Sequence, residues 1–378
     1  MKKLFISIVA VLFAATFSFA QNTDSTSQTG NNNRANTTQT GHNGAYSVQA
    51  GNLNKATTTQ TGTNTGGIYQ LDNGNNNTAT LSQNGSGNDA LVIQGMTQGY
   101  WGGKYQTVGA NYNKATLTQS GKNNEGNLEQ YGGSNSTNGN VAKLAQSGNG
   151  NTAYGYQGWA YGDVTTWALK HLQSYNSTVN ISQVGNNNWV GAWQYGGNNN
   201  NASITENGNN NLAEIAQGYI YSVPGLVFYT PVYNTQNNNA SVTQSGNYNH
   251  EKLFQLGNNN SFKLSQANGS SVGYNGTSAH VSPVYNAYFR QDGNNNQFTG
   301  VQTNGATLDA VSEGVTGYYG SFQQGNGNSI SLTQYNDNAL MQQLGNSNTA
   351  TLWQGGTNVN NATILQNGNS NIANVHQQ

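Results

Sequence analysis

The residue types that carry most enzymatic and metal-binding chemistry are few in this sequence, and their spacing is irregular. The five histidines (His42, His171, His250, His280 and His376) lack metal-ligand spacing, and the 13 acidic residues show no repeated pairing for acid–base catalysis. Cysteine is absent, which excludes disulfides and thiolate metal sites. Neither a phosphate-binding glycine loop nor a repeated calcium-binding motif occurs. We therefore predict no catalytic residue, no metal, no cofactor and no enzyme.

The chemistry that this sequence does offer is hydrogen bonding by side-chain amides. A glutamine amide supplies two donors and an acceptor oxygen, and glutamine recurs here every eleven residues in many places, as at 28 and 39, 183 and 194, or 366 and 377. A buried amide is costly alone, but it is satisfied when identical amides stack at a strand spacing of ~4.8 Å. The predicted stacking residues are Gln28, Gln39, Gln49, Gln60, Gln83, Gln94, Gln119, Gln130, Gln146, Gln157, Gln183, Gln194, Gln244, Gln255, Gln343, Gln354, Gln366 and Gln377, with Asn33, Asn54, Asn88, Asn151, Asn188, Asn249, Asn348 and Asn371. Glu206 stands where this spacing expects a glutamine.

Short β-strands are predicted to hold these glutamines. An aliphatic residue stands two positions before the glutamine and a small residue four positions before it, as in Ala115, Leu117 and Gln119. Because side chains alternate along a strand with a period of two, all three lie on one face, and Thr, Ser, Asn or Lys occupy the other face. No helical apolar stripe appears.

A tight reversal is predicted after each glutamine. Glycine commonly follows two residues later and asparagine five residues later, as in Gly148 and Asn151 after Gln146. Both residue types enter left-handed backbone conformations at low cost, so we expect one turn per half-unit and a rung of about 22 residues.

The expected fold is an all-β solenoid. Stacking of about 13 two-strand rungs would form two parallel sheets face to face around a core of Ala, Leu, Ile, Val and Gln. Antiparallel hairpins are the alternative, but side chains that repeat in register from unit to unit favour stacking.

The composition fits a self-associating protein better than a nucleic-acid-binding one. Charged residues are 7% of the chain and the formal net charge is −1, so there is no basic patch and little repulsion between copies. The 22 Tyr, 6 Trp and 10 Phe argue against low-complexity disorder.

We divide the chain into three parts. Residues 1–20 form a secretory signal peptide, with Lys2 and Lys3 before an apolar run and a predicted cut after Ala20. Residues 21–27 are a short polar lead, and residues 28–378 form one solenoid. Five aromatic-rich insertions, at 95–110, 158–178, 218–234, 267–289 and 303–320, are expected as loops at its edges, the first three at one edge and the last two at the other. These loops either pack on one another or contact carbohydrate or surfaces.

The repeated pattern Q-x-G-x-x-N-x-A-x-x-x-Q resembles the curlin repeat. It is seen in residues 49–60 (QAGNLNKATTTQ) and 83–94 (QNGSGNDALVIQ). Curlins are subunits of curli, the extracellular functional amyloid fibres of bacterial biofilms. The resemblance implies export through an outer-membrane pore, assembly nucleated at the cell surface, and stacking roles for the matching Gln and Asn residues.

The sequence therefore predicts a secreted structural subunit that adds head to tail to copies of itself. The last unit, residues 371–378, resembles the others and carries no polar cap, which leaves an edge for another chain. One alternative is a monomeric β-solenoid adhesin that binds glycan or ice through threonine rows such as Thr57 to Thr59. A polysaccharide-active β-helix enzyme would need clustered carboxylates on adjacent rungs, which the sequence lacks.

Overall fold

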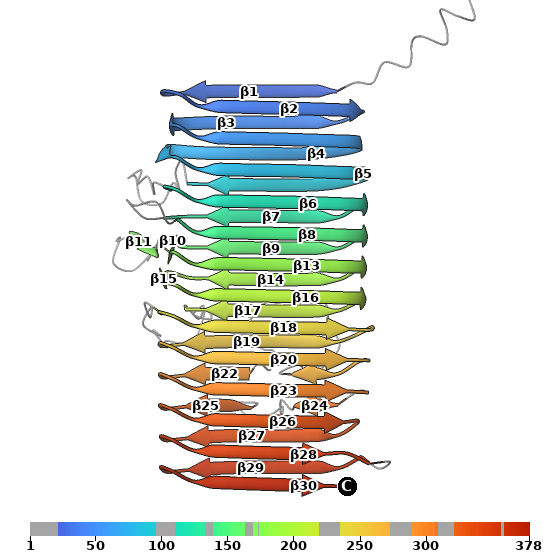
Figure 1. Ribbon diagram of the computed structural model, residues 1–378, viewed down its shortest axis with the longest axis vertical. Helices are drawn as coiled ribbons and strands as arrows, with labels where there is room; N and C mark the ends of the chain where they lie inside the picture. Colours follow the sequence, from blue (N-terminus) through green and yellow to red (C-terminus); the bar gives the residue numbers. More distant parts are fainter. Residues whose placement is uncertain are drawn as a thin grey trace, which may run out of the picture.

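The computed structural model describes residues 22–95, 110–132, 139–162, 169–172, 174–218, 235–272, 289–304, 306–308, 321–356 and 359–378. In this part of the chain the regular secondary structure is all strand, without a helix, as the sequence predicts. The strands stack in chain order along the long axis of the molecule, from β1 near the N-terminus to β30 near the C-terminus (Figure 1). The signal-peptide prediction and most of the five insertions fall outside the described residues.

The strands form two rows, because each strand of the stack pairs with its counterpart in the next rung and not with its immediate neighbour in the chain. All of these pairings are parallel. The first row contains β1 (Thr23–Thr29), β3 (Gly44–Asn52), the second parts of β4 (Lys55–Asn75) and β5 (Thr78–Gln94), β7 (Glu125–Gln130), β9 (Thr152–Gln157), β14 (Trp189–Gln194), β17 (Leu212–Gln217), β19 (His250–Leu256), β21 (Ser271–Val272), β22 (Phe289–Asp292), β24 (Thr307–Leu308), β25 (Phe322–Gln324), β27 (Asn338–Leu344) and β29 (Asn361–Asn367).

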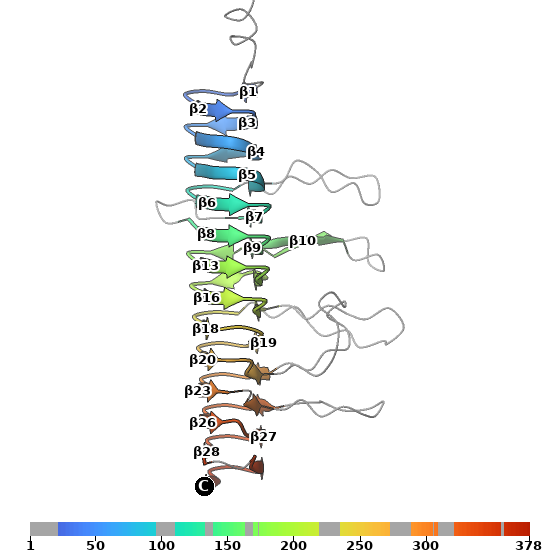
Figure 2. The ribbon, with the colours of Figure 1, turned by 90° about the vertical axis from the view of Figure 1, so that its right-hand side faces the viewer.

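The second row runs beside the first and supplies the other strand of each rung (Figure 2). It contains β2 (Arg34–Gly41), the first parts of β4 and β5, β6 (Lys114–Lys122), β8 (Val141–Asn149), β13 (Thr178–Asn186), β16 (Asn201–Asn209), β18 (Asn239–Ser245), β20 (Ser261–Ala267), β23 (Gln297–Thr303), β26 (Ser329–Tyr335), β28 (Thr349–Gln354) and β30 (Ile372–Gln377). Four short strands lie outside the rows: β10 (Trp159–Gly162) pairs antiparallel with β11 (Leu169–Leu172), and β12 (Ser174–Tyr175) pairs parallel with β15 (Gly197–Asn198).

The expectation of two separate sheets packed face to face is wrong. The rows belong to one 26-stranded sheet that closes round the core, almost as a barrel. The reason is that the backbone stays extended and paired through some turns: β4 and β5 run from one row into the other without a break, and Gly62 still pairs with Gly85 inside the turn. The count of about 13 rungs stays a prediction.

The core lies between the rows and is one continuous column of small and aliphatic side chains. Ala115, Leu117, Leu144 and Ile181 are among its buried members, at the positions two and four residues before a glutamine. The alternation of buried and more exposed residues along each strand therefore follows the predicted period of two.

The outer faces of the two rows differ in character, which the repeat alone does not predict. The second row carries mainly Thr, Ser, Asn and Lys on its outer face, as expected. The first row carries aromatic side chains in its middle part: Tyr154 and Trp189 have ring centroids 6.3 Å apart, and those of Trp189 and Trp193 are 5.9 Å apart. These rings are half-buried on the sheet.

The fourth and fifth insertions interrupt strands of the first row. β21 and β22 pair with consecutive parts of the single strand β19, and residues 273–288 separate them in sequence. β24 and β25 likewise pair with consecutive parts of β27. The expectation that these insertions leave from the edge opposite to the first three is therefore wrong, because the backbone departs within a strand and not at a turn.

Candidate functional site: two glutamine ladders and two open ends

Glutamine side chains form a ladder inside each row. The Nε2 of each glutamine donates to the Oε1 of its counterpart one rung further toward the C-terminus, at distances of 2.5 to 3.1 Å. The first-row ladder runs through Gln28, Gln49, Gln70, Gln94, Gln130, Gln157, Gln194, Gln217, Gln255, Gln291, Gln323, Gln343 and Gln366. The second-row ladder runs through Gln39, Gln60, Gln83, Gln119, Gln146, Gln183 and Glu206, and then through Gln244, Gln266, Gln302, Gln334, Gln354 and Gln377.

A second hydrogen bond fixes the direction of each amide. Gln60 Nε2 donates to Gln83 Oε1 at 2.7 Å and also to the carbonyl oxygen of Gly44 at 3.0 Å. Because a carbonyl oxygen can only accept, the amino group must face it, and the amide oxygen must face the preceding rung. The same pair of bonds recurs at Gln194, so the ladders point uniformly from the N-terminus to the C-terminus.

The structure brings every predicted glutamine into one of these ladders and adds others. The added members are Gln70, Gln217, Gln266, Gln291, Gln302, Gln323 and Gln334. Gln70, Gln291 and Gln323 lie at other spacings from the ladder residue before them, because half-unit lengths vary and insertions intervene. The others lie eleven residues after a ladder residue, as Gln266 does after Gln255, and the prediction omitted them although the spacing fits. The signal that could have found most of them is the apolar residue two positions earlier, such as Ile68 before Gln70.

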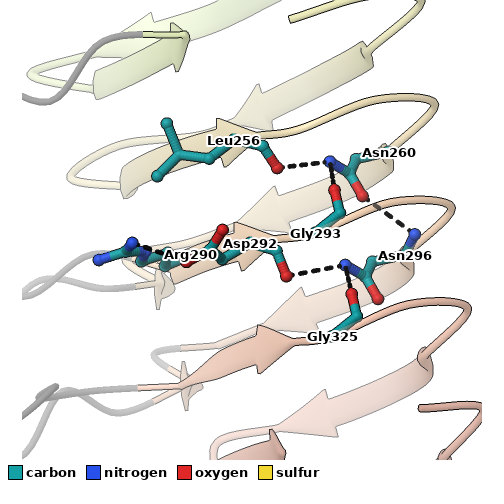
Figure 3. Close-up of polar contacts among 7 residues, drawn as sticks. All are labelled: Leu256, Asn260, Arg290, Asp292, Gly293, Asn296 and Gly325. Atoms are coloured by element: carbon teal, nitrogen blue, oxygen red, sulfur yellow. Dashed lines mark hydrogen bonds and ion pairs between the residues drawn. The ribbon is translucent and has the colours of Figure 1, made fainter. Parts of the chain in front are cut away.

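Asparagines form a third set of ladders, at the turns. Asn260 Nδ2 donates to the carbonyl oxygen of Leu256 in its own turn and to that of Gly293 in the next rung, both at 2.9 Å (Figure 3). The Asn260 oxygen accepts the backbone N–H of Asn296 at 3.0 Å. Each such asparagine therefore closes its own turn and also binds the turn of the next rung toward the C-terminus.

The predicted asparagines occupy this position in both rows. Asn33, Asn54, Asn348 and Asn371 lie in turns that follow first-row strands, and Asn88, Asn151, Asn188 and Asn249 lie in turns that follow second-row strands. Further buried members that the prediction omitted are Asn77, Asn113, Asn124, Asn211, Asn238 and Asn296. A more exposed ladder, three residues after the glutamine, was also missed; it includes Asn149, Asn186 and Asn209.

The turn uses left-handed backbone at two positions, and the ladder asparagine is at neither. One is the glycine two residues after the glutamine, such as Gly148 at φ 115°. The other is the residue four positions after it, which is Asn187 in one turn, and Leu53 and Asn123 in others, with φ between 54° and 59°. The ladder asparagine is selected for its side-chain hydrogen bonds and not for its φ angle.

Glu206 interrupts the chain of hydrogen bonds in the second-row ladder, because its carboxylate has no N–H to donate to the next rung. Its Oε2 accepts from Gln183 Nε2 at 3.0 Å, but its Oε1 occupies the place of an amino group and has no partner. Gln244 Oε1, which should receive that bond, is also unpaired. Burial raises the pKa of the Glu206 carboxyl well above its usual range, because an ionised carboxylate loses its hydration there.

Among the described residues, the two ends of the stack are open. β1 and β2 pair only with the strands that follow them, and β29 and β30 pair only with the strands that precede them. At the N-terminal end, no described group donates to Gln28 Oε1 or Gln39 Oε1. At the C-terminal end, Gln366 and Gln377 each donate one Nε2 hydrogen, to Thr349 O at 2.9 Å and Asn361 O at 3.3 Å, and the other is free for a further rung.

The described residues offer little else on which to build a site. No group of three or more His, Asp or Glu side chains gathers there that could hold a metal ion. No helix in this part of the chain has the length and apolar character needed to span a membrane.

Fold and ladders together define an all-β repeat protein with parallel stacked strands. The curlin associated repeat matches the chain at residues 74–99 and again at residues 176–205. The first match covers all of β5, and the second covers β13, β14, β15 and part of β16. Two regions of the chain therefore match the curlin repeat, as the sequence resemblance indicated. No curated protein matches the chain significantly.

Proposed function

We propose that this protein is an exported structural subunit that assembles head to tail into extracellular curli-type fibres of a biofilm matrix, where it serves adhesion and surface colonisation. Within this proposal, residues 1–20 are the cleaved signal peptide. The solenoid of about 13 rungs begins inside the predicted lead at residues 21–27, since Thr23–Thr29 form β1 and pair with β3. The partners are further copies, an outer-membrane pore and a nucleator. The aromatic insertions remain a candidate contact for carbohydrate.

The observation that carries the proposal is the complementarity of the two open ends. The C-terminal rung presents unused amide donors at Gln366 and Gln377, and the N-terminal rung presents unused acceptors at Gln28 and Gln39. If β1 of a second copy adds to β29, and its β2 adds to β30, both ladders continue without a change of direction. This contact does not close on itself, so repeated addition yields a filament.

The same register sets the core contacts between copies. When Gln28 of the added copy pairs with Gln366, Thr26 lies beside Ile364 and Asp24 lies beside Ala362. This follows because the two strands are parallel and their side chains alternate with a period of two. Asp24 is on the core side of its strand, because its partner Ala45 is buried. Addition of a copy would therefore bury one carboxylate.

The test is electron microscopy of the purified chain without residues 1–20, combined with thioflavin binding and fibre diffraction. We expect unbranched fibres with a meridional reflection at ~4.8 Å. A chain that stays a soluble monomer for days would contradict fibre assembly, and it would favour the monomeric adhesin.

A further inference from the structure

Three buried oxygen atoms without hydrogen-bond partners lie in the middle of the rod. They are Glu206 Oε1, Gln244 Oε1 and Glu251 Oε1, and all three side chains are 0% exposed. Glu206 and Gln244 are consecutive members of the second-row ladder, so their unpaired oxygens belong to one interrupted step.

Glu251 replaces a small core residue in the first row. Its partner in the preceding rung is Ala213, which is fully buried. The corresponding residue seven positions after Gln119 is Gly126, where an added Cβ would lie 3.1 Å from both Gln119 Nε2 and Gln146 Oε1. This core position therefore faces one step of the glutamine ladder.

The Glu251 carboxylate leans toward the rung that contains Ala213. Its Oε2 accepts the backbone N–H of Glu214 at 3.3 Å. Ala213, seven residues after Glu206, lies beside the step from Glu206 to Gln244 and leaves room there. The two glutamates thus approach the same interrupted step from opposite rows.

No positive charge compensates these two carboxyls inside the core. The charged and titratable groups on the strands packed around them lie on the outer faces: Lys252, whose Nζ is 3.3 Å from Glu214 Oε2, His250 and the exposed Lys263. An ionised carboxylate buried without a paired cation is very costly, whereas a neutral carboxylic acid supplies an O–H donor.

We propose that Glu206 and Glu251 are held as neutral carboxylic acids, and that their two protons make folding of the middle of the rod dependent on acid. The Glu206 hydroxyl takes the place of the missing amino group and donates to Gln244 Oε1, which restores the ladder. The Glu251 hydroxyl supplies the second donor in the same region. This proposal concerns the folded chain and does not depend on fibre formation.

The pH dependence follows from the direction of both shifts. Burial raises the pKa of Glu206 and of Glu251 well above their usual range, and the unfolded carboxyls titrate at about 4.3. The folded chain therefore binds more protons than the unfolded chain as the pH rises above about 4.3. The stabilising effect is complete below that pH, and the folding equilibrium weakens by about tenfold per pH unit for each acid until the folded group titrates.

The experiment compares the mature wild-type chain with Glu206→Gln, Glu251→Ala and the double variant. Glutamine restores the repeat residue at 206 and alanine restores it at 251, so we expect all variants to fold. Glu125→Gln is the matched control, because Glu125 is exposed and a glutamine oxygen can still accept from the Tyr154 hydroxyl. Infrared spectra of 13C-glutamate-labelled chain report carboxylic acid groups, and refolding is followed from pH 4 to pH 8.

We expect folded wild type to keep a protonated carboxyl band at neutral pH, each single variant to lose part of it, and the double variant to lose most of it. In wild type the refolding equilibrium should weaken by about a hundredfold more per pH unit than in the double variant. The control should stay close to wild type, because Glu125 affects the partly buried Asp89 carboxyl, whose pKa is raised mainly by burial. Equal pH profiles for wild type and double variant would overturn the proposal. So would loss of the protonated band together with stabilisation by added Na⁺ or Ca²⁺, which would indicate a bound cation.

Discussion

At the scale of the residue, glutamine is the side chain that both continues the ladder and donates a second hydrogen bond to a backbone carbonyl. Its amino group has two hydrogens, one for the next rung and one for a carbonyl across the core, and its oxygen accepts from the preceding rung. Lysine has no acceptor and ionised glutamate has no donor, so neither can continue the pattern. Counting eleven residues forward from the preceding ladder glutamine does not reach Gln291 or Gln323, because an insertion lies before each of them. Counting backward does reach them, since Gln302 and Gln334 follow them by eleven residues.

Lysine in place of an internal glutamine should strongly destabilise the rod. In Gln194→Lys an ammonium group would be buried between Gln157 Nε2, which loses its acceptor, and Gln217 Oε1, without a counter-ion. We expect a loss of more than about 3 kcal/mol in the free energy of unfolding and slower fibre growth. Denaturant unfolding and thioflavin kinetics measure the two effects.

The control for this substitution is Gln297→Lys, because Gln297 is on the outer face of β23 and is exposed. It should change stability by less than about 0.5 kcal/mol. If both variants assemble at the rate of wild type, the internal amides do not carry the stacking energy.

At the scale of the element, close contact between glycines in successive turns limits what the turn can accept. A Cβ added to Gly148, at φ 115°, would lie 1.8 Å from the carbonyl oxygen of Gly185 in the next rung. A Cβ added to Gly327, at φ 67°, would meet nothing closer than the Ser347 hydroxyl at 3.7 Å. The two glycines share a positive φ but differ in the space above them.

Gly148→Ala should therefore cost much more stability than Gly327→Ala. The second substitution carries only the left-handed backbone penalty of roughly 1 kcal/mol, while the first must also separate two stacked turns. We expect the Gly148 variant to be less stable by at least about 2 kcal/mol more, measured by denaturant unfolding and by faster amide exchange in β8 and β13. Equal losses in the two variants would contradict the idea that turn stacking selects glycine.

Local pattern predicted the parallel strands and the turns, but it could not place the insertions correctly. The interrupted strand formed by β21 and β22 is continuous only in space, since β19 holds both parts in register. A stack of three phenylalanines fills the adjacent core: the ring centroids of Phe262 and Phe298 are 4.7 Å apart, and those of Phe289 and Phe298 are 4.6 Å apart. Phe262 and Phe298 are on successive rungs, with an insertion between them in the sequence, so no short window of sequence reveals that contact.

At the scale of the whole molecule, the ladders give the rod a direction, and its two end faces are chemically different. The repeat predicts equal ends, because the first and last units share the same glutamine spacing. The core-side residues differ, however. Ile364 and Val375 face the C-terminal opening, whereas Asp24 and Thr37 lie at the N-terminal one, where the Thr37 hydroxyl donates to Asp24 Oδ1 at 3.3 Å. An inward-pointing charge on an edge strand opposes edge-to-edge addition, so Asp24 should slow growth.

Two end variants separate addition from folding. Asp24→Ala removes the carboxylate that addition would bury against Ala362, and we expect elongation to quicken by about tenfold, equivalent to ~1.4 kcal/mol.

Val375→Lys places a charge on the C-terminal core face. The rod should stay folded, because Val375 is only half-buried there, but growth from that face should stop. Asn374→Lys is the matched control, since Asn374 is exposed on the outer side of the same strand. Seeded growth followed by thioflavin fluorescence, with amide exchange as the folding readout, measures all three. Growth of the Val375 variant at the control rate would show that copies do not join through this face.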